Sequence, residues 1–266
     1  MCRSFLTQGE CPIDIVTRLR AAGCVFAEDE AALFQEAATS PDDLVSMVDR
    51  RVAGEPLEYI VGWAEFRGLR IAVEPGVFVP RRRTEFMVER ASALVSLGGV
   101  IVDLCCGTGA IGVAVATGMS EFELYAGEID PAAVRCARRN VEPIGGQVFQ
   151  GDLYDALPPS IRGRVDVLLV NAPYVPTDDI GMMPPEARDH EARVALDGGA
   201  DGLDVHRRVA ADASTWLKPG GHVLIETSVR QAASTERLLA AAGLTAWAEH
   251  SEEVDGTVGV GRKPAT

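Results

Sequence analysis

The sequence has no long apolar run and no paired-cysteine motif. None of its apolar stretches approaches the roughly 20 residues that a membrane-spanning helix requires, so we expect no transmembrane segment. The N-terminal stretch MCRSFLTQGECP has no basic segment followed by an apolar one and predicts no signal peptide. Its 6 cysteines include no CxxC pair. This argues against a zinc or other metal site and against a disulfide framework, and it favours a reducing cytoplasm.

Positive charge is also scarce. The chain carries 25 Lys and Arg against 39 Asp and Glu, a formal net charge of −14, and its only lysines are Lys218 and Lys263. Non-specific nucleic-acid binding needs a broad basic surface, so this balance argues against it. One local basic run remains, Arg81-Arg82-Arg83. Such a run is most often a solvated turn, and the alternative is a basic patch beside a binding site.

The first third of the chain is patterned for short helices. Apolar spacing predicts helices over about 12–23, 28–38 and 40–54, the last with Ser40 as N-cap, Pro41 in the first turn and Gly54 past the end. Runs rich in β-forming residues flank Arg67-Gly68 and predict a hairpin from about 58 to 73. We expect Trp63 and Phe66 to belong to the core.

From about residue 99, short apolar strands alternate with helices. The predicted strands are 100–104, 123–127, 147–150, 165–170 and 222–226, and the predicted helices are about 110–117, 131–141, 203–217 and 229–242. This alternation predicts an α/β fold with a parallel, doubly wound sheet. Two further apolar stretches, 244–248 and 257–261, predict an antiparallel pair at the sheet edge. Ligands of such sheets bind beyond the carboxyl ends of the strands, so we look for the site there.

The first strand is followed by a loop of small residues, Cys105 to Gly109. Gly107 and Gly109 allow a ligand to approach the backbone, and a helix begins directly after them. A tight turn without a ligand is the alternative. The spacing C-C-G-T-G-A-I-G departs from the dinucleotide fingerprint G-x-G-x-x-G. Asp103 would repel a pyrophosphate but attract the amino group of S-adenosylmethionine (SAM), which favours SAM over NAD.

The next two strands also end in acidic residues. Glu128 can accept hydrogen bonds from both ribose hydroxyls of an adenosine, although an ordinary surface acid is the alternative. We expect Asp130 to cap the following helix. After the third strand, Asp152 and Leu153 are placed to hold the exocyclic amine and the face of an adenine.

The fourth strand ends in the stretch VNAPYVP, which predicts the acceptor site. A planar nitrogen, either an amide or an aromatic amine, is a poor nucleophile because its lone pair is delocalised. Hydrogen bonds from its N–H groups to the Asn171 side chain and the Ala172 carbonyl would aim that lone pair at a sulfonium methyl, with Tyr174 packed on its flat face. A loop stiffened by Pro173 and plugged by an aromatic ring is the structural alternative.

These segments together resemble the HemK/PrmC-type protein-(glutamine-N5) methyltransferases over roughly residues 50 to 262. The resemblance rests on GEPLEYIVGWAEFRGLRIAVEPGVFVPRRRTE, DLCCGTGAIGVAVA, GDLYDAL, VNAPYVP and EARDHEARVALDGGADGLD. It implies a seven-stranded, Rossmann-like SAM-dependent methyltransferase sheet. It also implies a helical substrate-recognition domain over 1–55, a β-hairpin linker over 56–80 and a methyltransferase domain over 81–266.

The resemblance further implies the activity and its residues. The chain is expected to methylate the side-chain amide nitrogen of a glutamine in a protein, either a release factor or another protein, in the cytoplasm. We expect no contact with nucleic acid except through a ribosome-associated protein substrate, and no contact with a membrane. The expected substrate site is Asn171, Ala172, Pro173 and Tyr174. With the residues argued above, the expected cofactor site is Asp103, Cys105, Cys106, Gly107, Thr108, Gly109, Glu128, Ile129, Asp152, Leu153 and Asn171.

Four departures from the family pattern indicate a paralogue. The acceptor motif reads N-A-P-Y where the family has N-P-P-Y, so Ala172 keeps the carbonyl but loses the φ restraint of proline. Cys105 replaces the usual loop glycine, PRRRTE replaces PRPETE, and the N-terminal region is short. Two alternatives therefore stay open. One is an N6-adenine nucleic-acid methyltransferase, and the other is a SAM-binding module whose catalysis has decayed.

Other polar residues have two interpretations each. His190 and His206 are acid–base candidates, but loop or surface histidines are favoured. Glu85 either closes the SAM site or caps a helix, and Glu226, after the fifth strand, is interpreted as structural.

Overall fold

The computed structural model describes residues 12–265. The predicted absence of a signal peptide rests largely on residues 1–11, which lie outside the described residues. The chain divides into two compact units, Met1–Trp63 and Ala64–Thr266. In the described part of the chain, no helix combines the length and the apolar character needed to cross a membrane.

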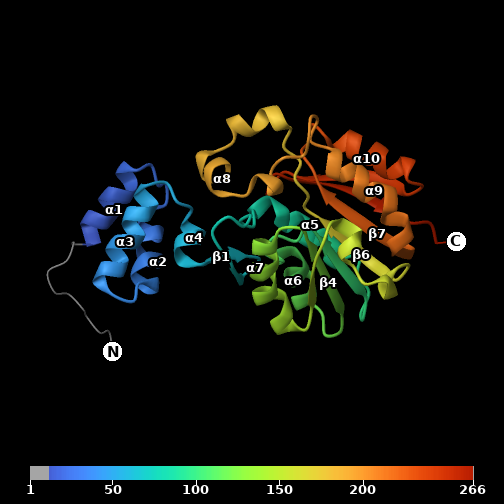
Figure 1. Cartoon of the computed structure of the whole chain (residues 1–266), viewed down its shortest axis with the longest axis horizontal. Coiled ribbons are helices and arrows are strands. Elements are labelled where there is room, and N and C mark those ends of the chain that lie inside the picture. Colours follow the sequence, from blue (N-terminus) through green and yellow to red (C-terminus); the bar gives the residue numbers. More distant parts are fainter. Residues whose placement is uncertain (1–11, 266) are drawn as a thin grey trace. The chain divides into compact units, whose positions relative to one another are not determined.

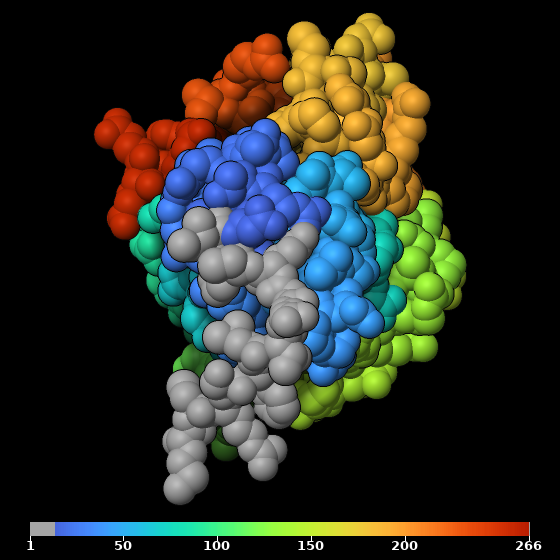
Figure 2. Space-filling view, turned by 90° about the vertical axis from the view of Figure 1, so that its left-hand side faces the viewer, coloured from blue at the N-terminus to red at the C-terminus, as the bar shows by residue number. Residues whose placement is uncertain are grey.

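The first unit is a small helical bundle. It contains α1 (Pro12–Ala21), α2 (Ala27–Ala37), α3 (Pro41–Val52) and α4 (Leu57–Val61). Leu19, Phe34 and Val48, one from each of the first three helices, are fully buried in one apolar cluster. Figure 2 shows the atoms of this unit, blue to light blue, packed closely together.

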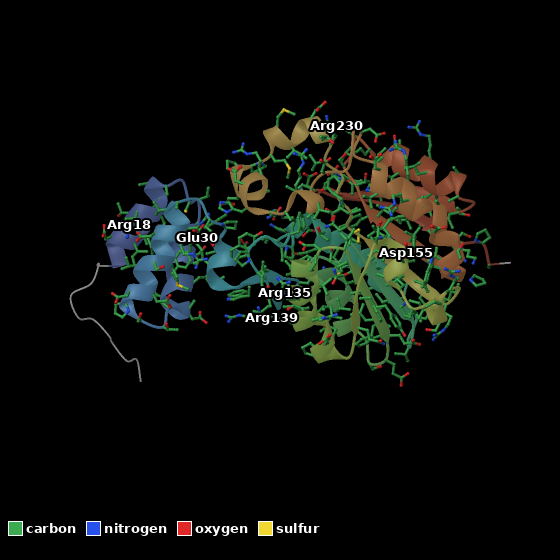
Figure 3. The ribbon with its side chains drawn as sticks, viewed as in Figure 1. Arg18, Glu30, Arg135, Arg139, Asp155 and Arg230 are labelled. Atoms are coloured by element: carbon green, nitrogen blue, oxygen red, sulfur yellow. The ribbon has the colours of Figure 1, made fainter. Side chains whose placement is uncertain are left out.

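Polar contacts define how α3 begins and how it packs. The predicted N-cap is confirmed, because the Ser40 hydroxyl accepts a hydrogen bond from the Asp43 N–H at 3.1 Å. Arg51 on α3 forms an ion pair with the nearly buried Glu30 on α2, with Nε and Oε2 2.7 Å apart (Glu30 is labelled in Figure 3). Burying a carboxylate requires such a partner, so this pair fixes the register of the two helices.

The predicted hairpin is wrong at its beginning. Residues 57–61 form α4, and the hairpin consists of β1 (Trp63–Phe66) and β2 (Leu69–Ala72). Tyr59 and Ile60 have β-forming side chains, but both are buried on the helical turn, and Gly62 ends that turn with φ 82°. Tertiary burial has overridden local propensity here. The predicted turn at Arg67-Gly68 is confirmed, with both residues in the left-handed region.

The second unit contains a seven-stranded sheet of order β5-β4-β3-β6-β7-β9-β8. Its strands are β3 (Val100–Leu104), β4 (Glu123–Glu128), β5 (Gln147–Gln150), β6 (Val165–Val170), β7 (Leu217–Glu226), β8 (Thr245–Ser251) and β9 (Gly256–Arg262). The first five are parallel, and β9 pairs antiparallel with both β7 and β8. The predicted parallel sheet and its antiparallel edge are confirmed. The fifth strand is longer than predicted and begins at Leu217.

Helices cover both faces of this sheet (Figure 1). They are α5 (Glu85–Ser92), α6 (Ala110–Thr117), α7 (Pro131–Val141), α9 (Asp204–Trp216) and α10 (Ala232–Ala241), whereas the short helix α8 (Pro185–His190) lies apart from the strands. Successive residues of β3 alternate between two apolar clusters. Ile101 packs in the cluster with α5, α6 and α7, whereas Val100 and Val102 pack in the cluster with α9. Burial on both faces explains why these strands are almost wholly apolar.

The strand order reverses between β3 and β6. The chain runs from β3 outward to β4 and β5, then returns to β6 on the other side of β3. Leu104, the last residue of β3, is paired with Gly127 on one side and Val170 on the other. The residues that follow these strands therefore meet at one edge, which is the switch point where doubly wound sheets bind ligands.

Candidate active site

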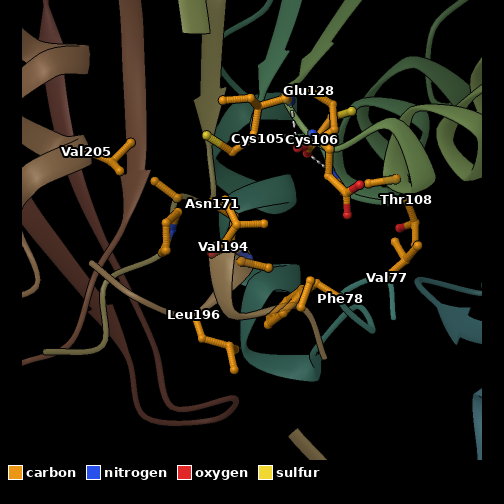
Figure 4. A pocket seen from close by; sticks show the side chains of 18 of the residues that line it. Val77, Phe78, Cys105, Cys106, Thr108, Glu128, Asn171, Val194, Leu196 and Val205 are labelled. Carbon is orange, nitrogen blue, oxygen red and sulfur yellow. Dashed lines mark hydrogen bonds between the residues drawn. The ribbon is translucent and has the colours of Figure 1, made fainter. Parts of the chain in front are cut away.

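A cavity of about 410 Å³ opens at this edge of the sheet (Figure 4). The volume lies in the range of roughly 300–1,000 Å³ that is typical of small-molecule sites. The structure brings most of the predicted site residues into its lining, namely Cys105, Cys106, Gly107, Thr108, Glu128, Ile129, Asp152, Leu153, Asn171, Ala172, Pro173 and Tyr174. Asp103 and Gly109 are not among the lining residues.

The loop between β3 and α6 depends on left-handed backbone. Gly107 has φ 55° and Gly109 has φ 76°. A Cβ at Gly109 would lie 2.6 Å from Cγ2 of Val141, so this glycine is needed for packing behind the loop. Cys105 has φ 55° without being a glycine. A strained non-glycine residue at a cavity wall is typical of a functional loop held by its surroundings.

Glu128, at the end of β4, is held by three backbone N–H groups. Its Oε2 accepts from Gly107 at 2.9 Å, and its Oε1 accepts from Ile129 at 2.8 Å and Asp130 at 3.0 Å. The side chain is almost buried and lines the cavity (Figure 4). A carboxylate offers about four lone-pair positions, so one remains on Oε2 for a further donor. This position can accept a hydrogen bond from one ribose hydroxyl of an adenosine.

Asp103 lies under α6 and away from the cavity lining. Its carboxyl is fully buried and accepts a hydrogen bond from the Gly112 N–H at 2.9 Å. Burial raises the pKa of Asp103 to about 7, and the negative charge of Glu128 adds to the rise. The structure thus places Asp103 in support of the first turn of α6.

Residues that follow β5 form another part of the cavity lining. Asp152 forms an ion pair with Arg208 of α9, with Oδ2 and Nη2 2.8 Å apart, and both line the cavity. Leu153 has φ 48°, the second non-glycine wall residue in the left-handed region. Asp130 caps α7 by accepting from the Ala132 N–H at 2.9 Å, as predicted. Sequence reasoning missed Arg208, which lies inside a helix with no motif around it.

The two side chains predicted to clamp the acceptor have buried partners. The Tyr174 hydroxyl donates to Oε1 of Glu226 at 3.2 Å, and Asn171 Nδ2 donates to the Thr84 hydroxyl oxygen at 3.5 Å. Glu226 is only 2% exposed, and burial raises its pKa. Burial also raises the pKa of Tyr174 well above its usual value, and the charge of Glu226 raises it further. Tyr174 is therefore a neutral hydroxyl.

A second loop packs against the carbonyls of the Asn171–Tyr174 turn. Gln231 Nε2 donates to the carbonyl oxygens of Tyr174 at 3.0 Å and Asp201 at 2.9 Å. A Cβ at Gly198 would lie 2.8 Å from the Pro173 carbonyl oxygen, and one at Gly202 would lie 2.3 Å from that of Tyr174. The GGADG stretch, residues 198–202, thus packs against the Asn171–Tyr174 turn, which no local sequence signal indicated. We call residues 171–174 the acceptor turn, after the role predicted for them.

The arginine run does not form a fully solvated turn. Arg81 pairs with the buried Glu191, whose Oε1 also accepts from the Val79 N–H at 3.1 Å. Arg83 lines the cavity, and its Nε lies 3.7 Å from Oε1 of Glu226. Arg82 is exposed. Two of the three guanidinium groups therefore have buried carboxylate partners, and that of Arg83 lies at the cavity.

The histidines take no part in the cavity lining, whereas two of the cysteines do. His206 is fully buried with its Nδ1 3.1 Å from the Thr235 hydroxyl, and burial lowers its pKa to about 4. His190 is also absent from the lining. Among residues 12–265, no group of His, Cys, Asp and Glu is arranged to hold a metal ion. The described cysteines are free thiols, and of these Cys105 and Cys106 line the cavity with their pKa values raised by burial.

The sequence of this chain is similar to those of known methyltransferases. Residues 68–183 match the family described as Methyltransferase small domain. The chain is 38% identical over 198 residues to the release factor glutamine methyltransferase of Geobacter sulfurreducens, covering 73% of this chain and 69% of that one. It is 39% identical over 205 residues to the 4-amino-L-phenylalanine/4-methylamino-L-phenylalanine methyltransferase of Streptomyces pristinaespiralis, covering 74% and 69%.

The fold has solved counterparts as well. A methyltransferase from Pyrococcus furiosus superimposes with a TM-score of 0.56 at 16% identity, covering 75% of this chain and 91% of that one. The predicted Rossmann-like methyltransferase fold is confirmed, and so is SAM as the cofactor. With this cavity at the switch point of the sheet and these relatives, the chain belongs to the HemK/PrmC-type release factor glutamine methyltransferase family of SAM-dependent enzymes.

Proposed function

We propose that this enzyme methylates the side-chain amide nitrogen of a glutamine in a protein, and that the protein is a peptide-chain release factor. One observation carries the proposal. A single cavity is lined both by Glu128, which fits the ribose of SAM, and by the Asn171–Tyr174 turn, which fits a planar nitrogen. Relatives named release factor glutamine methyltransferase supply the identity of the acceptor.

The chemistry requires acceptors and orientation more than a base. SAM, when bound, supplies a methyl group on a sulfonium sulfur. Asn171 and the Ala172 carbonyl accept hydrogen bonds from the amide N–H groups, which directs the nitrogen lone pair toward that methyl. As the new C–N bond forms, the C–S bond breaks and the nitrogen loses one proton to water. Tyr174 stays neutral and Glu226 lies behind it, so neither serves as the base.

Ala172 keeps the turn functional despite the missing proline ring. The residue is 2% exposed, so its backbone is enclosed by neighbours. Gln231 donates a hydrogen bond to the Tyr174 carbonyl, and the backbone of Gly198 lies so close to the Pro173 carbonyl that an added Cβ would collide with it. Neighbouring segments therefore restrain the turn, although the φ restraint of a proline at position 172 is absent. This supports an active enzyme rather than a decayed SAM-binding module.

The proposal also covers how the protein substrate is recognised and where in the cell the enzyme acts. We assign recognition of the protein substrate to residues 1–55 and place the enzyme in a reducing cytoplasm, where a thiol such as that of Cys136 persists.

A second candidate acceptor is a free aromatic amine. The Streptomyces pristinaespiralis relative is named for 4-amino-L-phenylalanine, whose aromatic amino nitrogen is conjugated with its ring and needs the same pair of acceptors. No comparable observation favours nucleic-acid methylation.

Methyl transfer from labelled SAM distinguishes these acceptors. The purified enzyme is incubated in parallel with a release factor and with 4-amino-L-phenylalanine, and the products are analysed by peptide mapping and mass spectrometry. Label on a release-factor glutamine supports the proposal. Label on the free amine alone supports the second candidate. SAM binding by calorimetry with transfer to neither acceptor would contradict both.

A further inference from the structure

Arg83 places a positive charge beside the acceptor turn. It lines the same cavity as that turn, and the hydroxyl of its neighbour Thr84 lies 3.5 Å from Nδ2 of Asn171. In addition, Arg83 Nε and the Tyr174 hydroxyl approach the same oxygen, Oε1 of Glu226, at 3.7 Å and 3.2 Å. The guanidinium therefore lies near the hydroxyl end of the Tyr174 ring.

The N–H donors of Arg83 remain available to a ligand. Its Nε is 3.7 Å from the Glu226 carboxylate, a distance that allows an ion pair but is too long for a hydrogen bond. Among residues 12–265 the guanidinium donates no hydrogen bond, and 47% of the side chain is exposed. Arginine carries five N–H donors in a rigid fork that matches the two oxygens of a carboxylate. The fork can therefore bind an anion that enters the cavity.

The other charged side chains of the cavity lining already have hydrogen-bonded partners. Glu128 accepts from three backbone N–H groups, and Asp130 caps α7. Asp152 and Arg208 bond to each other. These four lie at the end of β4, after β5 or on α9, on the side of the cavity predicted to hold the cofactor. Of the charged lining residues in the described part of the chain, Arg83 alone has no hydrogen-bonded partner.

We propose that Arg83 binds a carboxylate of the methyl acceptor, and that the enzyme prefers acceptors that carry this group near the reacting nitrogen. An acceptor whose planar group packs on the Tyr174 ring lies next to the guanidinium. Two sources offer the carboxylate, namely an Asp or Glu beside a glutamine of a protein and the α-carboxylate of a free amino acid. The inference rests on the proposed function, which places the acceptor nitrogen at Asn171.

Three variants test this assignment. Arg83→Gln removes the charge, and Arg83→Lys keeps the charge but loses the planar fork. Arg82→Gln is the matched control, because this arginine lies in the same turn, is exposed and is not among the residues that line the cavity. The melting temperature of each variant shows whether it is folded.

Two pairs of probes differ only in one carboxylate. The first pair is two capped peptides with either Asp or Asn next to a single glutamine, and it reports a side-chain carboxylate. The second pair is 4-amino-L-phenylalanine and its carboxamide, and it reports an α-carboxylate. Binding is measured by calorimetry on enzyme saturated with S-adenosylhomocysteine, so the readout does not depend on turnover. The Kd for SAM is measured separately.

We expect the wild type to bind the carboxylate member of at least one pair about 10-fold more tightly than the neutral member. Arg83→Gln should lose this preference without a change in the Kd for SAM. Arg83→Lys should keep part of the preference, and Arg82→Gln should keep all of it. A purely structural role of Arg83 through Glu226 would instead weaken both members of a pair equally.

Three results would overturn the inference. The first is equal binding, or no measurable binding, of the two members in both pairs by the wild type. The second is a preference that survives in Arg83→Gln or, should that variant not fold, a preference undiminished in Arg83→Lys. The third is a weaker Kd for SAM in the Arg83 variants, which would assign the guanidinium to the carboxylate of SAM. Absence of methyl transfer to glutamine would contradict the proposed function, which these binding measurements do not test.

Discussion

The carboxylate of Glu128 accepts a hydrogen bond from the backbone N–H of Gly107, with Oε2 and N 2.9 Å apart. This bond ties the end of β4 to the glycine loop after β3, two segments that meet because their strands are neighbours in the sheet. One side chain thus shapes the loop and presents a lone pair to the cavity. Cofactor affinity should depend on it more than on any other single carboxylate of the cavity.

Glu128→Ala should weaken SAM binding by about 10- to 100-fold, because hydrogen bonds to a charged group contribute roughly 1.5–3 kcal/mol. Isothermal titration calorimetry measures the Kd directly. Glu142→Ala, which removes an exposed acid just after α7, is the matched control. Equal affinities of the Glu128→Ala variant and the wild type would show that the carboxylate does not contact the cofactor.

Gly202→Ala should disrupt the acceptor turn. The added Cβ would lie 2.3 Å from the Tyr174 carbonyl oxygen, so the turn or the supporting loop must move. Gly163→Ala is the control, because that residue has nearly the same φ, 76° against 74°, and nothing within 4 Å of its Cβ. Both variants carry the left-handed strain of about 1–2 kcal/mol. Only Gly202→Ala should also lose turnover, measured by methyl transfer with saturating SAM.

Replacing Cys105 by glycine should leave the stability of the protein nearly unchanged, whereas replacing it by a β-branched residue should lower the stability. Its φ of 55° is left-handed, a conformation that glycine adopts freely and valine does not. We expect Cys105→Gly to remain within about 1 kcal/mol of the wild type in urea unfolding, since lost packing offsets relieved strain. Cys105→Val should lose about 1–3 kcal/mol. Equal stability of the two variants would mean that the backbone here is not strained.

Asp103 should make the enzyme less stable as pH rises toward neutrality. An unfolded Asp titrates near 3.8, whereas the pKa of folded Asp103 is about 7. Between these values the folded state keeps a proton that the unfolded state has lost. The free energy of unfolding therefore falls with pH by up to about 1.4 kcal/mol per unit and levels off above pH 7.

The Asp103→Asn variant isolates this contribution. It retains an oxygen for the Gly112 N–H but has no titrating group. Urea unfolding of both proteins at about pH 5 and about pH 8 should show a larger loss for the wild type. If the free energies of unfolding of the two proteins changed equally with pH, the pKa of Asp103 would not be raised in the folded state.

The fold was largely predictable because its signals are local. Asp130 and Pro131 mark the start of α7, and the apolar run 165–170 coincides with β6. The segment 57–61 was not predictable, because Tyr59 and Ile60 favour strands and only burial in the bundle makes them helical. The Lys218-Pro219-Gly220 stretch resembles a turn, so the start of β7 at Leu217 was missed.

The candidate site was predictable where a residue directly follows a strand. Glu128 and Asn171 were found this way. Glu226 ends its strand in the same manner, and the same rule would have selected it as more than structural. Thr84 and Gln231 could not be predicted, because their contacts are with Asn171 and the Tyr174 carbonyl, which are remote from them in sequence.

Mass spectrometry of a release factor incubated with SAM and either the wild-type enzyme or Asn171→Ala tests the central claim most directly. The account predicts one added methyl on a glutamine side chain with the wild type. It predicts loss of transfer by about 100-fold or more with Asn171→Ala, at unchanged melting temperature and with SAM at saturating concentration. Near-normal methylation by Asn171→Ala would contradict the proposed clamp, and an unmodified glutamine after incubation with the wild type would contradict the proposed acceptor.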